Sequence, residues 1–419
     1  MKNLKFDESI VKIVEESEKE LENIFKKYDQ NCFFSSAKIV EAFNKNRVSN
    51  VHFGEVTGYG YSDFGRETLE QVYSDVFKCE DALVRPQIMS GTHAIYLVLA
   101  GLTKHGDTLI SISGEPYDSL KSIIGLEGKS NNSLIKNGVK FEQIDLKNND
   151  FDIIAIQNRL KKSKVKMVEI QRSRGYSDRD SLCIEKIARV CKAIKQVDKD
   201  VIIFVDNCYG EFTEDKEPTE VGADIVAGSL MKTLGGGHAR SGGYIIGRKD
   251  LVWEVSERFS APCIGKDIGA NLNQLYSYYK GLYMAPNTAC AALKTMTLAS
   301  LVLEKLGYKV SPRFNEHRTD TLQTVVLNNR EKMINFCECC QKGTIVDNFV
   351  KPIASETPGY PHEEIMASGS FTTGSTAEFS CDGPLIPPYT VYMQGSLTYE
   401  YGKLSLLTAF SNLVRSKNF

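Results

Sequence analysis

Short apolar segments alternate with amphipathic ones between residues 81 and 246, and this alternation constrains the fold more than any other feature of the chain. The apolar segments have the length and composition of buried strands, and the segments between them have helical spacing. The expected strands cover 81–89, 107–113, 140–146, 165–171, 201–206, 225–227 and 243–246. This pattern predicts an α/β domain in which helices cover a mostly parallel central sheet.

The length predicts more than one structural unit, because 419 residues exceed the size of a usual single core. Apolar residues at helical spacing in 7–46 predict about two amphipathic helices, which would form an N-terminal helical arm. After about residue 285 the pattern of expected elements changes. Helical runs cover 289–306 and 318–340, and strand-like segments follow at 364–371, 377–380 and 389–394. We therefore expect an arm over 1–46, a large α/β domain over 47–285 and a smaller C-terminal α+β domain over 286–419.

Charge and hydropathy exclude several classes of partner. The net charge is −2, which gives no reason to expect binding to nucleic acid or to an acidic membrane surface. No apolar run is long enough to span a bilayer, and the charged start of the chain does not resemble a signal peptide. A cytoplasmic location is the expectation.

The cysteines predict neither a disulfide framework nor a metal site. Their number, eleven, is odd, and no export signal precedes them. Cys337, Cys339 and Cys340 form one cluster, but a zinc site would need a second Cys or His pair at a workable distance. Reduced cysteines on a helix are the preferred interpretation, and we expect no metal.

Two charged residues follow neighbouring predicted strands. Asp206 ends the strand 201–206, and Lys232 comes just after the strand 225–227, within Gly-Ser-Leu-Met-Lys. In open α/β sheets the site lies beyond the carboxyl ends of the strands. This is the arrangement that a pyridoxal phosphate enzyme needs, because a lysine amine forms a Schiff base with the cofactor aldehyde and an aspartate keeps the pyridine nitrogen protonated. The pair predicts a catalytic role for Lys232 and Asp206.

Small polar residues offer a phosphate site. Ser90, Gly91 and Thr92 precede an apolar helix, and the free N–H groups and dipole of a helix N-terminus suit a phosphate. Ser229 lies three residues before Lys232 and could join the same phosphate. The alternative for both places is simple helix capping. We favour phosphate binding because Lys232 and Asp206 accompany them.

Two rings compete for stacking on the cofactor. Tyr117 follows the strand 107–113, where an aromatic ring could lie on the pyridine face, and His93 could supply the same contact. Gln171, at the end of the strand 165–171, is a short polar group within reach of the cofactor.

Several arginines are candidates for binding anions. Tyr59, Tyr61 and Arg66 share a glycine-rich loop, and a bidentate arginine beside a tyrosine hydroxyl suits a phosphate; the alternative is an exposed surface loop. Three further arginines could hold a substrate carboxylate, and the sequence does not rank them: Arg172, Arg174 and Arg318.

Six separated stretches resemble a known family. They are 57–66, 82–93, 170–176, 205–211, 228–232 and 382–392. The chain is similar over these stretches to the pyridoxal-phosphate proteins related to methionine gamma-lyase and cystathionine beta-lyase, also called aluminium resistance proteins. One stretch departs from the family pattern, since His238-Ala-Arg240 follows the triple glycine.

The resemblance implies the fold type I, aminotransferase-like architecture of PLP-dependent transferases, and dimers that pair into homotetramers with shared active sites. It also implies that Tyr61 and Arg66, with Tyr59 as a substitute, reach the cofactor phosphate of the neighbouring subunit, which places Tyr61 among the catalytic residues.

The expected activity is carbon–sulfur lyase chemistry on a small amino acid such as cystathionine, cysteine or methionine, by β- or γ-elimination. Two alternatives remain open. One is a different pyridoxal phosphate reaction, such as transamination, racemisation or γ-replacement. The other is cofactor binding without turnover.

Overall fold

The computed structural model describes residues 6–56 and 58–416. The first five and last three residues of the predicted terminal units lie outside this part of the chain, as does Thr57 of the predicted loop.

A seven-stranded sheet forms the centre of the larger lobe, in the order β1-β7-β6-β5-β4-β2-β3. Strands β2 to β6 run parallel, and β7 is antiparallel to both of its neighbours. The strands are β1 (Asp81–Arg85), β2 (Thr108–Ser111), β3 (Lys140–Gln143), β4 (Met167–Gln171), β5 (Ile202–Asp206), β6 (Ile225–Ser229) and β7 (Gly243–Gly247). The predicted mostly parallel α/β fold is confirmed.

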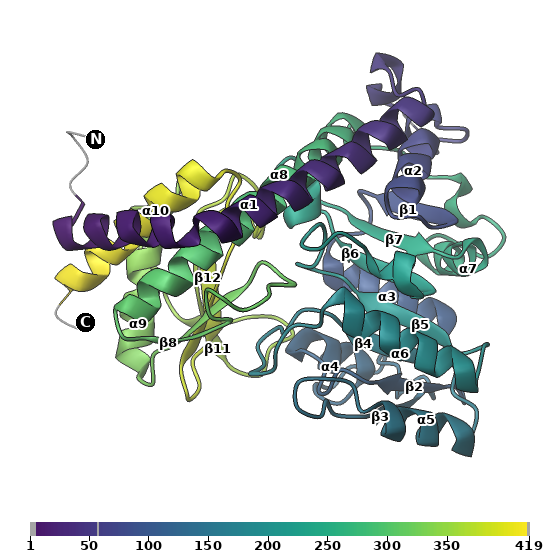
Figure 1. Ribbon diagram of the computed structural model, residues 1–419. Helices are drawn as coiled ribbons and strands as arrows, with labels where there is room; N and C mark the ends of the chain where they lie inside the picture. Colours follow the sequence, from purple (N-terminus) through teal and green to yellow (C-terminus); the bar gives the residue numbers. More distant parts are fainter. Residues whose placement is uncertain (1–5, 57, 417–419) are drawn as a thin grey trace.

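Helices cover both faces of this sheet (Figure 1). Alternate residues of a strand point to opposite faces, so Ile202 and Phe204 enter one core, which includes α3 and α7, whereas Ile203 and Val205 enter the other, which includes α2 and α6. The helices of this lobe are α2 (Phe64–Val76), α3 (Gly91–Leu102), α4 (Asp118–Ile124), α5 (Ile153–Lys162), α6 (Ile184–Val197) and α7 (Lys249–Phe259). Short 3-10 turns are η1 (Asn50–Phe53), η2 (Pro218–Val221), η3 (Thr233–Gly235) and η4 (Gly265–Asp267).

A second, antiparallel sheet belongs to the C-terminal lobe, in the order β10-β11-β12-β13-β9-β8. Its strands are β8 (Lys309–Ser311), β9 (Gln323–Val326), β10 (Ser355–Glu356), β11 (Glu363–Ser368), β12 (Ser380–Pro384) and β13 (Thr390–Gln394). Helices α9 (Arg330–Lys342) and α10 (Tyr399–Arg415) share its apolar core, and the three clustered cysteines are buried on α9. The helix predicted over 318–340 is wrong in its first part, because β9 pairs with β13 and β8 there.

Two long helices connect the lobes (Figure 1). The first is α1 (Glu8–Lys45), which replaces the two helices predicted for 7–46 because no Gly or Pro interrupts this segment. Its residues Ile10 and Val14 pack in the C-terminal core, whereas Ile39 and Ala42 pack in the core of the larger lobe.

The second is α8 (Leu275–Lys305), which packs along α1 and also contributes to both cores. It runs across the predicted boundary at 285, so the proposed division into units stays a prediction. Within residues 6–56 and 58–416, no helix is both long and apolar enough to cross a membrane.

Candidate active site

The carboxyl ends of three adjacent strands bring the predicted polar residues to one edge of the central sheet. Gln171 and Asp206, the last residues of β4 and β5, are direct partners in the ladder. Ser229 ends β6 beside them, and Lys232 follows three residues later. Because these strands are parallel, their ends gather side chains that are far apart in the sequence.

Asp206 is buried, with 4% of its surface exposed. Its Oδ1 accepts a hydrogen bond from the Cys208 N–H at 3.0 Å. Burial raises the pKa of the Asp206 carboxyl, although this hydrogen bond and the charge of Lys232 act in the opposite direction. A cationic partner would therefore stabilise the ionised form of this buried carboxyl.

Lys232 lies over an aromatic ring, with its Nζ 3.6 Å from the centroid of Tyr209. Burial lowers the pKa of the Lys232 amine, but acidic groups around it, including Cys208 and Asp206, outweigh this and raise it above its ordinary value. Tyr209 has φ 69°, a left-handed conformation that costs free energy for a residue other than glycine. Tyr209 lies in the stretch 205–211 that carries the family resemblance, but only the fold shows its contact with Lys232.

The N-terminus of α3 packs against the end of β6. A Cβ added to Gly91 would lie 3.1 Å from the Ser229 Cβ and 3.2 Å from the Cys208 Sγ, so glycine permits this approach. Ser90 is the N-cap of α3 and its Oγ accepts the His93 N–H at 3.1 Å, while the Ser229 Oγ accepts the Met231 N–H at 3.1 Å. Both serines thus make the capping-type bonds that were the alternative to phosphate binding. Their hydroxyls also lie beside the free N–H groups of a helix start.

Tyr117 is tied to the strand ends. Its N–H donates to the Gln171 Oε1 at 3.1 Å, and the Gln171 Nε2 donates to the Ser173 carbonyl at 3.0 Å. Burial raises the pKa of Tyr117 and the charge of Asp206 adds to the shift, which shows that the phenol lies within electrostatic reach of that carboxylate.

The other two residues near the helix start are held by local contacts. The His93 Nδ1 accepts the Met89 N–H at 3.2 Å, and burial lowers the pKa of the His93 ring. Thr92 Oγ1 lies 3.5 Å from Ser119 Oγ. The charge of Asp206 acts on the pKa of Tyr117, and the choice between Tyr117 and His93 as the stacking ring stays a prediction.

The tyrosine loop has two different parts. Arg66 is buried and its Nη1 donates to the carbonyls of Gly60 and Gly269 at 2.8 and 2.7 Å. Tyr59 and Tyr61 are 70% and 67% exposed, with ring centroids 5.9 Å apart. Within one chain, Arg66 shapes the loop while both tyrosines face solvent.

Two of the three candidate arginines are enclosed by the protein. The Nη1 of Arg172, which is fully buried, donates to the Asn207 Oδ1 at 2.7 Å, and its Nη2 donates to Glu214 at 2.8 Å. Arg318 donates to the Leu322 carbonyl at 3.0 Å and to the Gln323 side chain. These bonds argue against the proposed role in holding a substrate carboxylate, since both guanidinium groups already serve the surrounding backbone and side chains.

Arg174 is also buried, and its Nη1 donates to the Ser311 Oγ at 3.0 Å. Its Nη2 lies 3.7 Å from the Asp180 carboxylate, and its charge lowers the pKa of Tyr392, which burial raises. The charge of Arg174 therefore reaches Tyr392 of the C-terminal lobe.

The C-terminal lobe supplies a carboxyl that we did not single out from the sequence. Asp382, on β12, accepts the Tyr176 hydroxyl on Oδ1 and the Gln394 Nε2 on Oδ2, both at 2.9 Å. Burial raises the pKa of Asp382 to about 6, and the charge of Lys232 lowers it, so the carboxyl and the lysine interact. Tyr176 and Asp382 lie in stretches that carry the family resemblance, but only the fold brings them together.

Comparison with known proteins gives a consistent result over nearly the whole chain. The sequence model of the methionine gamma-lyase family matches residues 10–414. The uncharacterized protein YnbB of Bacillus subtilis (strain 168) is 40% identical over 414 residues, which cover 98% of each chain.

Solved structures agree with this. A candidate cystathionine beta-lyase involved in aluminum resistance from Clostridium acetobutylicum is 42% identical, with a TM-score of 0.94 and coverage of 97% of this chain and 96% of that one. The pyridoxal-5'-phosphate dependent protein YhfS from Escherichia coli shares the fold alone, with 16% identity, a TM-score of 0.62 and coverage of 94% and 97%.

Proposed function

The chain belongs to the methionine gamma-lyase family, and we propose that it is a pyridoxal-phosphate-dependent carbon–sulfur lyase acting on a sulfur amino acid. The observation that carries the proposal is the placement of Lys232 and the buried Asp206 at one edge of the central sheet, next to the start of α3.

The residues at this edge fit the cofactor. Asp206 is a buried carboxyl suited to a protonated pyridine nitrogen, and Lys232 is the amine that would bond to the aldehyde. The N-terminus of α3, with Ser90 and Thr92, and Ser229 would hold the phosphate, because Gly91 keeps the space between them free of a side chain. Tyr117 would lie on the ring face. When bound, the cofactor stabilises negative charge at the substrate Cα.

The protein's own groups then divide the remaining work. Lys232 Nζ would take the Cα proton of the bound amino acid and return a proton later. Tyr209, packed against that amine at 3.6 Å, limits where Nζ can move. Gln171 fixes the backbone of Tyr117 and so positions its ring. Loss of a thiol from Cβ or Cγ would leave a product that hydrolyses to a 2-oxo acid and ammonia.

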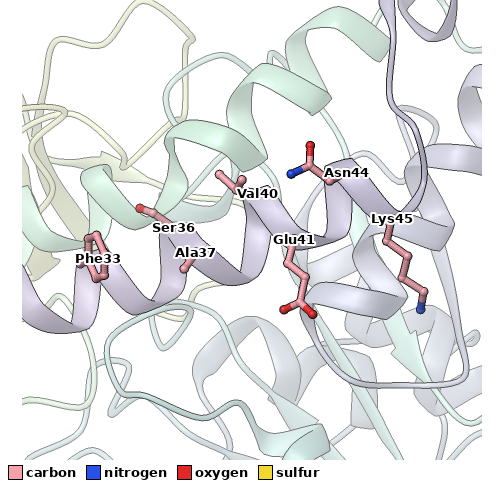
Figure 2. Close-up of a pocket in the computed structure, with 7 residues that line it drawn as sticks. All are labelled: Phe33, Ser36, Ala37, Val40, Glu41, Asn44 and Lys45. Atoms are coloured by element: carbon pink, nitrogen blue, oxygen red, sulfur yellow. The ribbon is translucent and has the colours of Figure 1, made fainter.

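Shared active sites are a further part of the proposal. A homotetramer, a dimer of dimers, would place the exposed Tyr59 and Tyr61 against the phosphate of a neighbouring subunit. Support comes from other exposed apolar surface: Phe33 is 71% exposed and Phe34 61% exposed on α1. Figure 2 shows the hollow along this face of α1, lined by Phe33, Ser36, Ala37, Val40, Glu41, Asn44 and Lys45.

The test is product analysis with L-cystathionine, L-cysteine and L-methionine. Pyruvate from cystathionine indicates β-elimination, and 2-oxobutanoate indicates γ-elimination. Transamination would give a 2-oxo acid without a free thiol or ammonia, whereas γ-replacement would release a thiol but neither a 2-oxo acid nor ammonia. A protein that binds the cofactor but converts no sulfur amino acid would refute the lyase assignment.

A matched control isolates the lysine. Lys232→Ala should abolish 2-oxo acid release, whereas Lys280→Ala should not, although the Lys280 Nζ also lies near a tyrosine ring, 5.6 Å from the centroid of Tyr276.

A further inference from the structure

A group of aromatic rings and carboxyls lies on the C-terminal side of the site, apart from the residues assigned to the cofactor. The Tyr176 ring centroid is 4.8 Å from that of Tyr392 and 5.9 Å from that of Tyr360. The Tyr176 hydroxyl and the Gln394 amide occupy the two oxygens of Asp382. Asp382 is thus fixed in place by two neutral donors.

Glu364, on the adjacent strand β11, completes the group. It is only 4% exposed, and its Oε1 is buried without a hydrogen-bond partner. Burial raises the pKa of Glu364, the Asp382 charge adds to the shift and the Tyr176 hydroxyl opposes it, so the Glu364 carboxyl lies near both residues. A buried carboxylate oxygen without a donor costs free energy, and such groups in native proteins call for a missing partner.

The C-terminal lobe contacts the segment that carries Lys232, because the Thr376 N–H donates a hydrogen bond to the Met231 carbonyl at 3.3 Å. The charge of Lys232 lowers the pKa values of both Asp382 and Tyr360, which burial raises. Tyr360 belongs to the segment 356–363, which lines a hollow of its own. A Cβ on Gly359 of this segment would lie 3.5 Å from the Ser119 Cβ, two residues beyond Tyr117. The segment therefore packs against the start of α4, next to Tyr117.

We propose that Asp382, Glu364 and the surrounding tyrosines bind a cationic group at the far end of the substrate. The inference rests on the proposed lyase function and narrows its substrate class to sulfur amino acids whose leaving half carries an ammonium. Tyrosine faces attract a cation, Asp382 supplies negative charge, and the unpartnered Oε1 of Glu364 accepts an N–H. A neutral leaving group, such as the methyl thiol half of methionine, leaves that oxygen unpaired.

The charges around the group agree with this assignment. Burial raises the pKa of Asp382 to about 6 and that of Glu364 to about 7. The hydrogen bonds from Tyr176 and Gln394 lower the pKa of Asp382, while the negative charges of Asp382 and Asp118 raise that of Glu364. A bound ammonium would favour the ionised form of both carboxyls.

Two isosteric probes test the inference with the wild-type holoenzyme. S-(2-aminoethyl)-L-cysteine carries an ammonium where S-propyl-L-cysteine carries a methyl group. With water, β-elimination converts the first to 2-aminoethanethiol, pyruvate and ammonia, and the second to propanethiol, pyruvate and ammonia. We expect kcat/KM at least about tenfold higher for the aminoethyl compound, as for a buried charge pair. If elimination is γ, the same comparison uses the two compounds as competitive inhibitors of the active substrate.

The outcomes separate this inference from the proposed function. Equal or better use of the propyl compound overturns the cation site and leaves the lyase assignment standing. No 2-oxo acid from either probe or from the three sulfur amino acids named above overturns both.

Single variants show which carboxyl is responsible for the preference between the two probes. Glu364→Gln and, separately, Asp382→Asn should bring the ratio between the two probes toward one. Glu331→Gln should leave the ratio as in the wild type, because Glu331 is exposed on α9, away from this group. Circular dichroism and thermal unfolding establish that each variant folds. A folded Glu364→Gln enzyme with the wild-type ratio would overturn the assignment.

Discussion

Glu169 provides a quantitative test of the electrostatics beneath the site. It lies on β4, two residues before Gln171 and on the same face of the sheet, and is 2% exposed. Burial raises its pKa from 4.5 to about 7; the Asp206 charge adds to the shift, and Ser111 and Arg179 oppose it. A carboxyl with a raised pKa stabilises the fold while it is protonated, and this stability is lost as the pH rises through the folded-state pKa.

The expected size follows from the two pKa values. At about 1.4 kcal/mol per pKa unit, the raised pKa of Glu169 lowers the free energy of unfolding by about 3 kcal/mol at pH 8 but by less than about 1 kcal/mol at pH 5. Glu169→Gln removes the charge at both pH values. The free energy of unfolding of the variant, relative to that of the wild type, should therefore be about 2.5 kcal/mol larger at pH 8 than at pH 5, so that the variant gains stability at pH 8. For a chain of this length this is a difference of about 3 °C in Tm.

The assay is thermal unfolding of both proteins, without added cofactor, at the two pH values. Glu16→Gln, at an exposed position of α1, is the control and should show no such difference. If the Tm difference between the variant and the wild type is no larger at pH 8 than at pH 5, the ionised Glu169 carboxylate does not destabilise the fold.

Four further outcomes are expected. Lys232→Ala should fold, bind the cofactor at best non-covalently and lose activity by orders of magnitude, as measured by 2-oxo acid release. Gly91→Val should weaken cofactor binding in a spectroscopic titration, because its side chain would enter the space between α3 and β6. Tyr61→Ala should lower activity, and coexpression with Lys232→Ala should restore about a quarter of the sites if subunits pair at random; no recovery would contradict shared sites. The preference for the aminoethyl probe over the propyl probe should grow from about pH 5.5 to about pH 8, because Asp382 and Glu364, with pKa values of about 6 and about 7, ionise over this range. A ratio that does not change with pH would contradict the role of these two carboxyls.

The sequence predicted the site best where local pattern and topology agree. Asp206 and Lys232 follow apolar runs that read as buried strands, and parallel strands bring their ends together whatever the details of packing. The seven central strands were placed for the same reason, with differences only at their ends.

Long-range packing accounts for what the sequence did not reveal. Arg172 and Arg174 are alike in sequence, and only the fold shows that Asn207 and Glu214 enclose the first. Tyr176 and Asp382 are 206 positions apart and meet because β12 of the antiparallel sheet lies against the segment that follows β4. The helical pattern of α1 was visible, but its continuity across both cores depends on its contact with α8.

The most direct test of the central claim is the visible absorption spectrum of the purified protein, followed by borohydride reduction and peptide mapping. We expect a yellow protein whose reduced label is found on Lys232. A protein that stays colourless after incubation with pyridoxal phosphate, or a label on another lysine, would contradict the assignment of this site.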